Sequence, residues 1–200
     1  IYDGTSAHDN GESSNDRRLI KNSYFNSLGD DNAYVGFMYG TLGASTYAET
    51  HANTNDSTIK TALDAWYNEN IKDTTNEHYI VDAIYCNDRE VSTTNSNYAG
   101  DGSGTTTTLY KVSERLYLGT NKTPTLQCSQ VNDRFTKSAT VSGEKGNGAL
   151  TYPIGLITAD EVTYAGGMTS TNKKYYLYTG RDWWTMSPDR LSSGQAFGLQ

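Results

Sequence analysis

The amino-acid sequence predicts an α+β domain with two short helices, small β-sheets and long loops. The chain has 200 residues, of which 35% are hydrophobic, and 16 of its aromatic residues are Tyr. Asn, Ser, Thr and Gly are abundant, which favours turn-rich β structure over a helical bundle. Two segments carry helix signals, and several short aromatic and aliphatic runs are typical of strands. A chain with this low hydrophobic content can still form a core, because each aromatic side chain buries a large surface.

The length suggests one domain, which we expect to span residues 33–200. Residues 1–32 are rich in Asp, Asn, Ser and Gly, and we interpret them as an irregular entry segment or a linker from a preceding domain. The run AYVGFMYG at 33–40 is the first expected strand. Residues 41–52 are expected to form a loop.

The best helical period lies in NDSTIKTALDAWYNENI, residues 55–71. Asn55 or Asp56 is expected to cap the N-terminus of this helix. Because Trp66 lies inside the apolar stripe, we expect it to anchor the core rather than to form a platform for a ligand. The stripe has the i, i+3, i+4, i+7 spacing of an amphipathic helix and consists of Ile59, Ala62, Leu63, Trp66, Tyr67 and Ile71.

The middle of the chain holds one expected strand, one polar region and one ambiguous segment. HYIVDAIYC, residues 78–86, predicts a buried strand. Residues 90–108 are low in apolar content, so we expect either a flexible insertion or an exposed β-excursion. Residues 109–119 fit a strand or a short helix, and we favour a strand.

The chain has two cysteines, Cys86 and Cys128. They fit one disulfide formed in an oxidising compartment, with two separate buried thiols as the alternative. We expect Leu126 to carry Cys128 into the core. An Asn-Asp-Arg tripeptide follows each cysteine, at 87–89 and 132–134. This repetition suggests two similar corners beside one bridge, although it is also compatible with coincidence in a chain rich in Asn and Asp.

Explicit start and stop signals surround a short helix at about residues 159–165, within GLITADEVTYAGG. Thr158 and Glu161 have the spacing of a capping box, in which each side chain bonds to the main-chain N–H of the other residue. Gly166 and Gly167 supply the left-handed end.

Two aromatic runs follow this helix, YYLYTG and RDWWTMSP, and both predict buried strands. We expect the core to form around the helix and the pair Trp183–Trp184. A last short strand is expected at about residues 196–199.

These segments together resemble a known family. GLITADEVTYAGG followed by WWTMSP is similar to the helix and core strand of C-type-lectin-like domains of the formylglycine-generating-enzyme type. The closer resemblance is to surface proteins of Gram-positive bacteria, often with prepilin-like N-termini. It rests on ANTNDSTIK, YCNDR, PTLQC, NDRF, GNGALTYPIGLITADEV, YYLYTG and WWTMSP, between about Ala52 and Pro188. The positions that fit the pattern are Thr158, Glu161, Ala165, Gly166, Gly167, Trp184 and Ser187.

The resemblance implies a C-type-lectin-like fold, with two short helices packed on twisted antiparallel β-sheets. It also implies a secreted or cell-surface location and a binding or structural role, with no established ligand. The chain departs from the family in lacking a hydrophobic pilin helix. It also stops soon after the Trp strand, where related chains continue into a further strand, so we expect an open β-edge.

Nothing in the sequence predicts an active site. The three histidines, His8, His51 and His78, lie in polar contexts without metal-binding spacing, so we expect each on the surface. The nucleophile, phosphate-binding and dinucleotide-binding motifs of common enzymes are absent. WWTMSPD lacks the calcium ligands of lectins, and GDGSG at 100–104 lacks the distal Glu of a calcium loop. We therefore expect neither enzymatic activity nor a cofactor or structural metal, with calcium held by scattered oxygens left open.

Charge and hydropathy exclude several kinds of partner. The formal net charge is −7, which argues against nucleic acid and against docking on anionic lipid. The sequence has no run of about 20 apolar residues that could insert in a membrane.

A binding surface remains. Aromatic side chains next to Asp, Asn and Arg are suited to carbohydrate or protein recognition. The candidate ligand-binding residues flank the Trp strand and are Tyr176, Tyr178, Arg181, Asp182, Asp189 and Arg190. Most tyrosines can equally well serve only to build the core.

The leading functional prediction is therefore a non-enzymatic extracellular domain for adhesion or ligand binding. We expect its ligand to be a host glycan or protein, and its place to be a bacterial surface or a pilus-like filament. The alternative is a structural subunit that assembles into a filament when a neighbouring copy completes its open β-edge.

Overall fold

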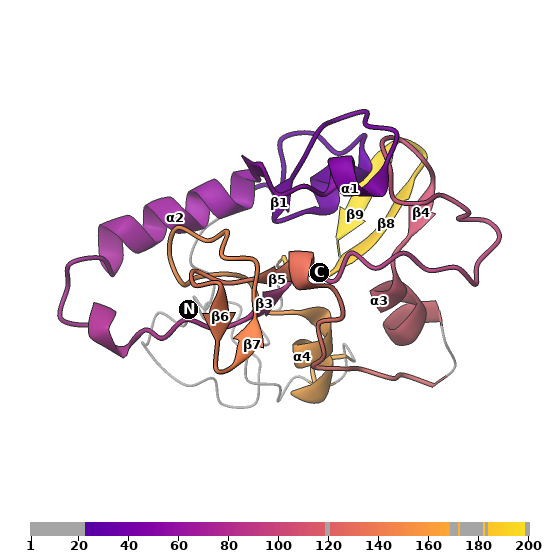
Figure 1. Ribbon diagram of the computed structural model, residues 1–200. Coiled ribbons are helices and arrows are strands. Elements are labelled where there is room, and N and C mark those ends of the chain that lie inside the picture. Colours follow the sequence, from indigo (N-terminus) through magenta and orange to yellow (C-terminus); the bar gives the residue numbers. More distant parts are fainter. Residues whose placement is uncertain (1–22, 119–120, 169–171, 173–181, 183, 199–200) are drawn as a thin grey trace.

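The computed structural model describes residues 23–118, 121–168, 172, 182 and 184–198 (Figure 1). The helices in this part are α1 (Tyr47–Thr50), α2 (Thr58–Asn70), α3 (Lys111–Ser113) and α4 (Ala159–Tyr164). None of them is long and apolar enough to cross a membrane. Shorter turns are the 3-10 segments η1 (Asn32–Val35), η2 (Glu77–Tyr79) and η4 (Val131–Asp133), and the π-helical η3 (Glu114–Leu118).

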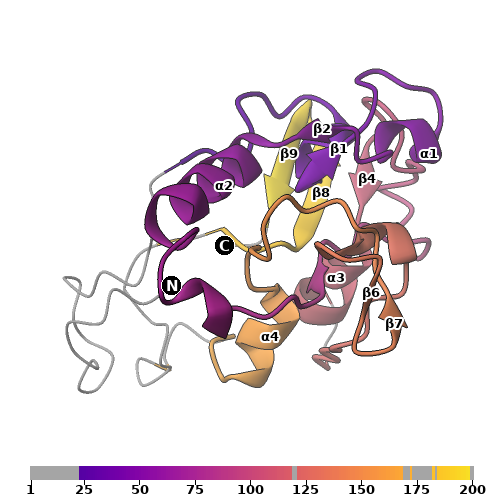
Figure 2. The same cartoon turned by 60° about the vertical axis from the view of Figure 1, so that its left-hand side comes forward.

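The strands of the described part form small antiparallel sheets. One sheet has the order β4–β8–β9, and the others are the pairs β1–β2, β3–β5 and β6–β7. Their bounds are β1 (Met38–Tyr39), β2 (Asn55–Asp56), β3 (Tyr85–Cys86), β4 (Thr108–Leu109), β5 (Arg134–Phe135), β6 (Thr140–Val141), β7 (Glu144–Lys145), β8 (Pro188–Ser192) and β9 (Gln195–Gly198). Figure 1 shows α2 at one end, the β4–β8–β9 sheet at the other and the β3–β5 pair between them, while Figure 2 shows α4 below β8. The architecture is therefore α+β, as the sequence predicted.

The core consists of two apolar clusters. The larger one lies beside α2 and joins segments from the whole described chain: Phe37, Met38, Ile59, Leu63, Tyr67, Phe135, Leu150, Ile154 and Met186. The smaller one lies at α3 and α4 and contains Val35, Tyr110, Val112, Leu116 and Ala159.

Helix α2 confirms the predicted amphipathic helix, although its cap differs from the prediction. Ser57 is the N-cap, and its Oγ accepts a hydrogen bond from the Lys60 N–H at 3.1 Å. Asn55 and Asp56 do not cap the helix, because they pair with Tyr39 and Met38 as strand β2. Trp66 is half-buried and packs against the larger cluster.

The strand predicted at residues 33–40 is wrong over its first half. The Asp31 carboxylate accepts the Ala33 N–H at 2.8 Å and so caps the 3-10 turn η1, leaving only Met38–Tyr39 as a strand. The loop predicted at 41–52 contains the single turn of helix α1. Its N-cap, Thr46, accepts the Glu49 N–H at 3.3 Å, a local signal that the sequence prediction missed.

The buried strand predicted at 78–86 is also mostly wrong. Only Tyr85–Cys86 pairs, and Val81 is 74% exposed. The strand favoured at 109–119 is helical over most of its described length, because β4 ends at Leu109 and α3 begins at Lys111 and continues into η3.

The polar region 90–108 packs inward over its second half. Gly102, Ser103 and Gly104 are buried. The amide of buried Asn32 donates to the main-chain oxygens of Ser103, Gly104 and Thr106 at 3.2, 2.9 and 2.8 Å. This part of the region is therefore tied to η1, and it is not an exposed excursion.

Helix α4 has both of the predicted end signals. Thr158 and Glu161 form the capping box. Gly166 adopts a φ of +88°, its N–H bonds to the oxygen of Thr163, and the Gly167 N–H bonds to the oxygen of Val162 at 2.8 Å. These two bonds satisfy the last carbonyl groups of the helix.

The strand predicted around the Trp pair starts later than expected. Trp184 and the buried residues Thr185, Met186 and Ser187 form no strand, and β8 begins at Pro188. The Ser187 Oγ accepts the Ala159 N–H at 2.9 Å, so this segment packs on the start of α4. The final predicted strand is confirmed by β9, whereas Trp183 and the run at 175–180 lie outside the described residues.

Candidate functional site

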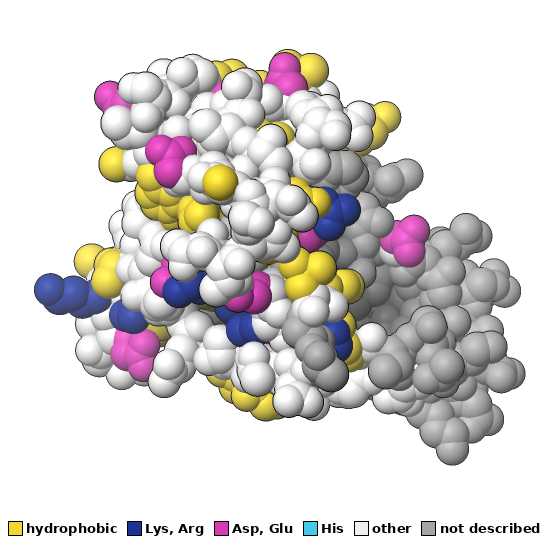
Figure 3. All heavy atoms as spheres, turned by 90° about the vertical axis from the view of Figure 1, so that its right-hand side faces the viewer, with side chains coloured by type: hydrophobic (Ala, Val, Ile, Leu, Met, Phe, Trp, Pro, Cys, Tyr) yellow, Lys and Arg dark blue, Asp and Glu magenta, His cyan; other side chains and the backbone are white. Residues whose placement is uncertain are grey.

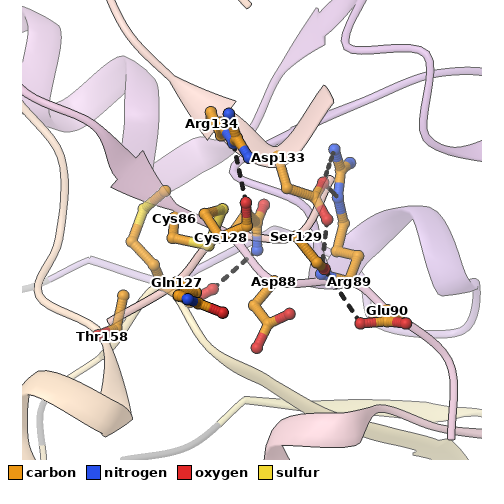
Figure 4. The surroundings of a disulfide bond; sticks show 12 residues. Cys86, Asp88, Arg89, Glu90, Gln127, Cys128, Ser129, Asp133, Arg134 and Thr158 are labelled. Atoms are coloured by element: carbon orange, nitrogen blue, oxygen red, sulfur yellow. Dashed lines mark hydrogen bonds and ion pairs between the residues drawn. A yellow bond between two sulfur atoms is a disulfide. The ribbon is translucent and has the colours of Figure 1, made fainter. Parts of the chain in front are cut away.

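The predicted disulfide is present and joins β3 to the segment before β5. Cys86 and Cys128 are bonded, with 5.7 Å between their Cα atoms (Figure 4). Strand pairing places Cys86 opposite Arg134, whose Nε donates to the Cys128 oxygen at 2.8 Å. Leu126 does not carry Cys128 inward, because its side chain is 71% exposed. The strand register and the Arg134 hydrogen bond hold the cysteine instead.

The two Asn-Asp-Arg tripeptides lie side by side and pair with each other. Buried Arg89 donates from Nε to Oδ1 of Asp133 at 2.7 Å, and its main-chain N–H reaches Oδ2 at 2.8 Å. The Asn87 N–H donates to the main-chain oxygen of Asp133. The two corners are not alike, since Asp88 has a φ of +42° whereas Asp133 ends the 3-10 turn η4. The two tripeptides therefore join the same two segments of the chain that the disulfide joins.

His51 is buried beside this pair, so the expectation that it lies on the surface is wrong. Its Nε2 lies 3.0 Å from the Gly102 oxygen and its Nδ1 lies 3.4 Å from Nη1 of Arg89. Burial, and then the nearby Arg89 charge, hold the pKa of His51 well below its ordinary value. The ring is therefore neutral, with Nε2 donating to the carbonyl group and Nδ1 accepting from Arg89.

A second charged group lies at the start of α4. Arg115, from the π-helical turn η3, binds the carboxylates of both Asp88 and Asp160. Burial raises the pKa of Asp88, while Arg115 acts in the opposite direction. Asp160 also accepts the Thr125 N–H at 2.9 Å. These groups are occupied by one another, so they stabilise the fold and offer no free acid, base or nucleophile.

Open space with aromatic walls occurs elsewhere, at the face shared by segment 24–30, residues 184–188 and the β8–β9 turn. We call it the aromatic hollow; its volume is about 450 Å³. Its aromatic lining consists of Tyr24, Phe25, Tyr34 and Trp184. Its polar lining includes Ser27, Asp30 and Gln195, all exposed.

Three hydrogen bonds bring the separate chain segments together at the aromatic hollow. The Trp184 Nε1 donates to the Ser23 oxygen at 3.2 Å, and the Trp184 ring meets Phe25 edge-on with centroids 5.8 Å apart. The Asn26 amide donates to the Tyr34 oxygen at 2.9 Å. The Ala196 N–H of strand β9 donates to the Gly29 oxygen. The walls are thus fixed from both ends of the described chain.

The polar side chains at the rim have unused hydrogen-bonding capacity. Within the described part of the chain, the side chains of Tyr24, Ser27, Asp30 and Gln195 make no hydrogen bond. Tyr24 is also 76% exposed. A phenol, a hydroxyl, a carboxylate and an amide therefore stand free around an apolar floor, an arrangement that suits reversible binding of a small molecule.

The predicted ligand-binding residues are placed only in part. Tyr176, Tyr178 and Arg181 lie outside the described residues. Asp182 is exposed, and Asp189 forms an ion pair of 2.9 Å with Arg190 on β8. Asp189 also accepts a hydrogen bond from Ser113. None of these three described residues lines the aromatic hollow.

The sequence interpretation missed Tyr24 and Phe25. The signal was a pair of adjacent aromatic residues inside a mostly polar entry segment. Its meaning depends on contacts with Trp184, some 160 residues later in the chain.

The surface and the ligand groups of the described chain do not point to a metal centre. No group of three or more His, Cys, Asp or Glu side chains in this part is placed to hold a metal ion. The face that carries β4 and α3 shows acidic and basic side chains intermixed among uncharged ones (Figure 3).

Comparisons with known proteins do not assign the chain to a family. No protein-family model, curated protein or solved structure matches it. The likeness to C-type-lectin-like domains therefore remains an expectation from the sequence.

Proposed function

We propose that the chain is a non-enzymatic binding domain that acts outside the cell or on its surface and takes its ligand in the aromatic hollow. The observation that carries the proposal is the meeting of Tyr24, Phe25 and Trp184 around open space with free polar side chains at its rim. Aromatic faces with a few convergent polar groups are the usual lining of a ligand site.

The chemistry of the lining favours binding over catalysis. No His, Cys, Lys or Arg is among the described residues that line the aromatic hollow. A hydrolytic or transfer reaction would need a nucleophile next to a base, or a convergent acid and base. Asp30 is the one acidic side chain among the described residues that line the aromatic hollow, and it makes no hydrogen bond to another described residue.

The proposed location rests on the disulfide. Disulfides persist in oxidising environments such as the cell exterior, and they are rare in the cytosol. The Cys86–Cys128 bond lies beside the buried ion pair of Arg89 and Asp133. The disulfide and the ion pair join the same two segments of the chain, so formation of one supports formation of the other.

The proposal is tested by measuring binding of the labelled, oxidised protein to arrays of immobilised glycans and of extracellular proteins. We expect at least one specific interaction that Tyr24→Ala abolishes, without any change in the bound molecule by mass spectrometry. Turnover of a bound molecule would contradict the non-enzymatic proposal. If the protein bound no molecule on either array, the proposed binding function would be contradicted.

The alternative, a self-assembling subunit, is favoured by a different observation. The expected open edge at β9 is partly covered, because the Ala196 N–H is bonded to Gly29. Another segment fits the requirement better: among the described residues, the main chain of residues 81–84 makes no hydrogen bond, and Ile80 and Val81 are exposed. Its charged residue, Asp82, turns back to accept the N–H groups of Lys137 and Ser138 at 3.0 and 2.7 Å. An unpaired, β-prone segment of this kind can add a strand from a second copy.

Sedimentation velocity over a range of protein concentrations separates this alternative from the first proposal. A subunit that pairs through residues 80–84 would form oligomers that Val81→Lys removes, because a charged edge resists strand addition. A single monomeric species at all concentrations would exclude it.

A further inference from the structure

We infer that the aromatic hollow is a site for a neutral saccharide of one or two rings, bound without a metal ion. This inference rests on the proposed binding function and adds the chemical class of the ligand. It follows from the size of the hollow, its aromatic surfaces, its free polar groups and the charge around it.

The size of the aromatic hollow fits a ligand of this kind. Its volume of about 450 Å³ lies within the range of roughly 300–1,000 Å³ that is typical of small-molecule sites. One or two pyranose rings with their hydroxyl groups fill such a space.

The aromatic side chains offer what the apolar face of a sugar ring needs. Tyr24 is 76% exposed, so most of its surface is open to a ligand. Phe25 and Trp184 hold each other in an edge-to-face arrangement at an angle of 64°, which fixes their orientation before any ligand binds. Fixed aromatic surfaces add contact area at low cost in side-chain entropy.

The free polar groups match sugar hydroxyl groups in their hydrogen-bonding character. The Gln195 amide has both donors and an acceptor, the Ser27 hydroxyl and the Tyr24 phenol can donate and accept, and the Asp30 carboxylate accepts. Sugar hydroxyl groups likewise donate and accept at once, so neighbouring hydroxyl groups can pair with this set. A purely apolar ligand would leave the rim unused.

Charge decides between neutral and ionised ligands. No basic side chain lines the described aromatic hollow, and the chain has a formal net charge of −7, so acidic sugars are disfavoured. Asp30 could attract an organic cation to the aromatic rings. However, Asp30 is exposed, and solvent and salt screen such an attraction. A neutral ligand is therefore favoured over either ion.

Calcium is not required by this mode of binding. The described residues hold no group of three or more potential metal ligands, and the proposed contacts use aromatic rings, hydroxyl groups and an amide. Binding should consequently persist in a chelator.

The test uses the oxidised full chain on a surface array of neutral mono- and disaccharides, sialylated and uronic-acid-containing saccharides, immobilised choline and a peptide library. The array is probed once in calcium and once in EDTA. The strongest probe is then titrated against the wild type and the variants Tyr24→Ala, Gln195→Ala and Asp30→Asn. Tyr79→Ala is the matched control, because Tyr79 is 73% exposed but does not line the aromatic hollow.

We expect a neutral saccharide to be the strongest probe. Tyr24→Ala and Gln195→Ala should each weaken its binding tenfold or more, while Tyr79→Ala changes it less than twofold. If choline is the strongest probe and Asp30→Asn abolishes its binding, the saccharide inference is overturned and the binding function stands. The same conclusion holds if the strongest probe is an acidic sugar or a peptide whose binding is lost in Tyr24→Ala. Binding that no hollow variant alters, or that EDTA removes, overturns the inferred site. No binding to any probe overturns both the inference and the proposed function.

Discussion

Arg89 and Asp133 belong to two separate Asn-Asp-Arg tripeptides, and their side chains form one ion pair inside the protein, with 2.6 Å between Nη2 and Oδ1. Both side chains are fully buried. Arg89 also donates to the Met38 oxygen at 3.0 Å and to the Asn53 side chain at 3.0 Å. The guanidinium group thus joins β1, the segment before α2 and the disulfide region.

Removing the carboxylate should be costly because it leaves the guanidinium buried without its counter-charge. We expect Asp133→Asn to lower the free energy of unfolding by about 3–5 kcal/mol, measured by urea denaturation. Lys111→Ala is the control, since Lys111 and Glu90 form a partly exposed pair and its loss should cost less than about 1 kcal/mol. Equal, small losses in the two variants would contradict a structural role for the buried pair.

The buried, neutral state of His51 predicts how stability depends on pH. The folded pKa of His51 is lowered, so the unfolded chain, with a pKa of about 6.5, binds a proton that the folded chain does not. Stability should therefore fall as the pH is lowered through about 6.5. Thermal unfolding between pH 7.5 and 5.5 should show this fall in the wild type and in His78→Gln, whose ring is exposed. In His51→Gln the unfolding temperature should depend less steeply on pH. An unchanged pH dependence in this variant would assign the effect to other groups.

The disulfide should stabilise the folded state chiefly by restricting the unfolded chain. Its cysteines are 42 residues apart, so the chain-entropy relation gives a contribution of about 4 kcal/mol. The double substitution Cys86→Ser with Cys128→Ser should lower the urea midpoint accordingly, and reduction of the wild type should have the same effect. Alkylation of the unreduced protein followed by mass spectrometry should find no free thiol; two labelled thiols would contradict the bond.

The two ends of α4 should differ in their sensitivity to substitution by Ala. Thr158→Ala removes the N-cap hydroxyl and should cost about 1 kcal/mol. Gly166→Ala places a Cβ at a φ of +88°, and that Cβ would lie 3.0 Å from the Asn172 side chain, so we expect a loss of about 1–2 kcal/mol. Denaturant unfolding measures both. Gly143→Ala is a useful comparison, because Gly143 also has a positive φ but no atom lies within 4 Å of the added Cβ.

Local signals account for what the sequence could predict. Helix α4 was predictable because the residues that cap its start and end it lie within ten positions of one another. Helix α2 was predictable because its apolar stripe has a regular period. The disulfide was predictable from two cysteines in a polar, loop-rich chain. The fold class followed from the same features and from the short β-type runs.

Predictions that depended on distant neighbours were less successful. Residues 78–84 have the composition of a buried strand, yet burial of a strand requires a partner on its edge and a layer on its face, which the described chain supplies only from Tyr85 onward. His51 stands among polar residues in sequence and is buried only because Gly102 and Arg89 fold over it. The aromatic hollow was not predictable because Tyr24 and Trp184 meet only in the folded chain.

The Cys86–Cys128 bond also determines how the domain would respond to a mechanical load. A pull on the chain outside the bond passes directly from one sulfur to the other, so the residues between them cannot be extended. With a separation of 42 residues, about 150 Å of contour length is withheld from stretching. An oxidised domain on a surface under flow would thus lengthen far less than a reduced one, and α3, η3 and the buried residues 102–104 would bear no tension.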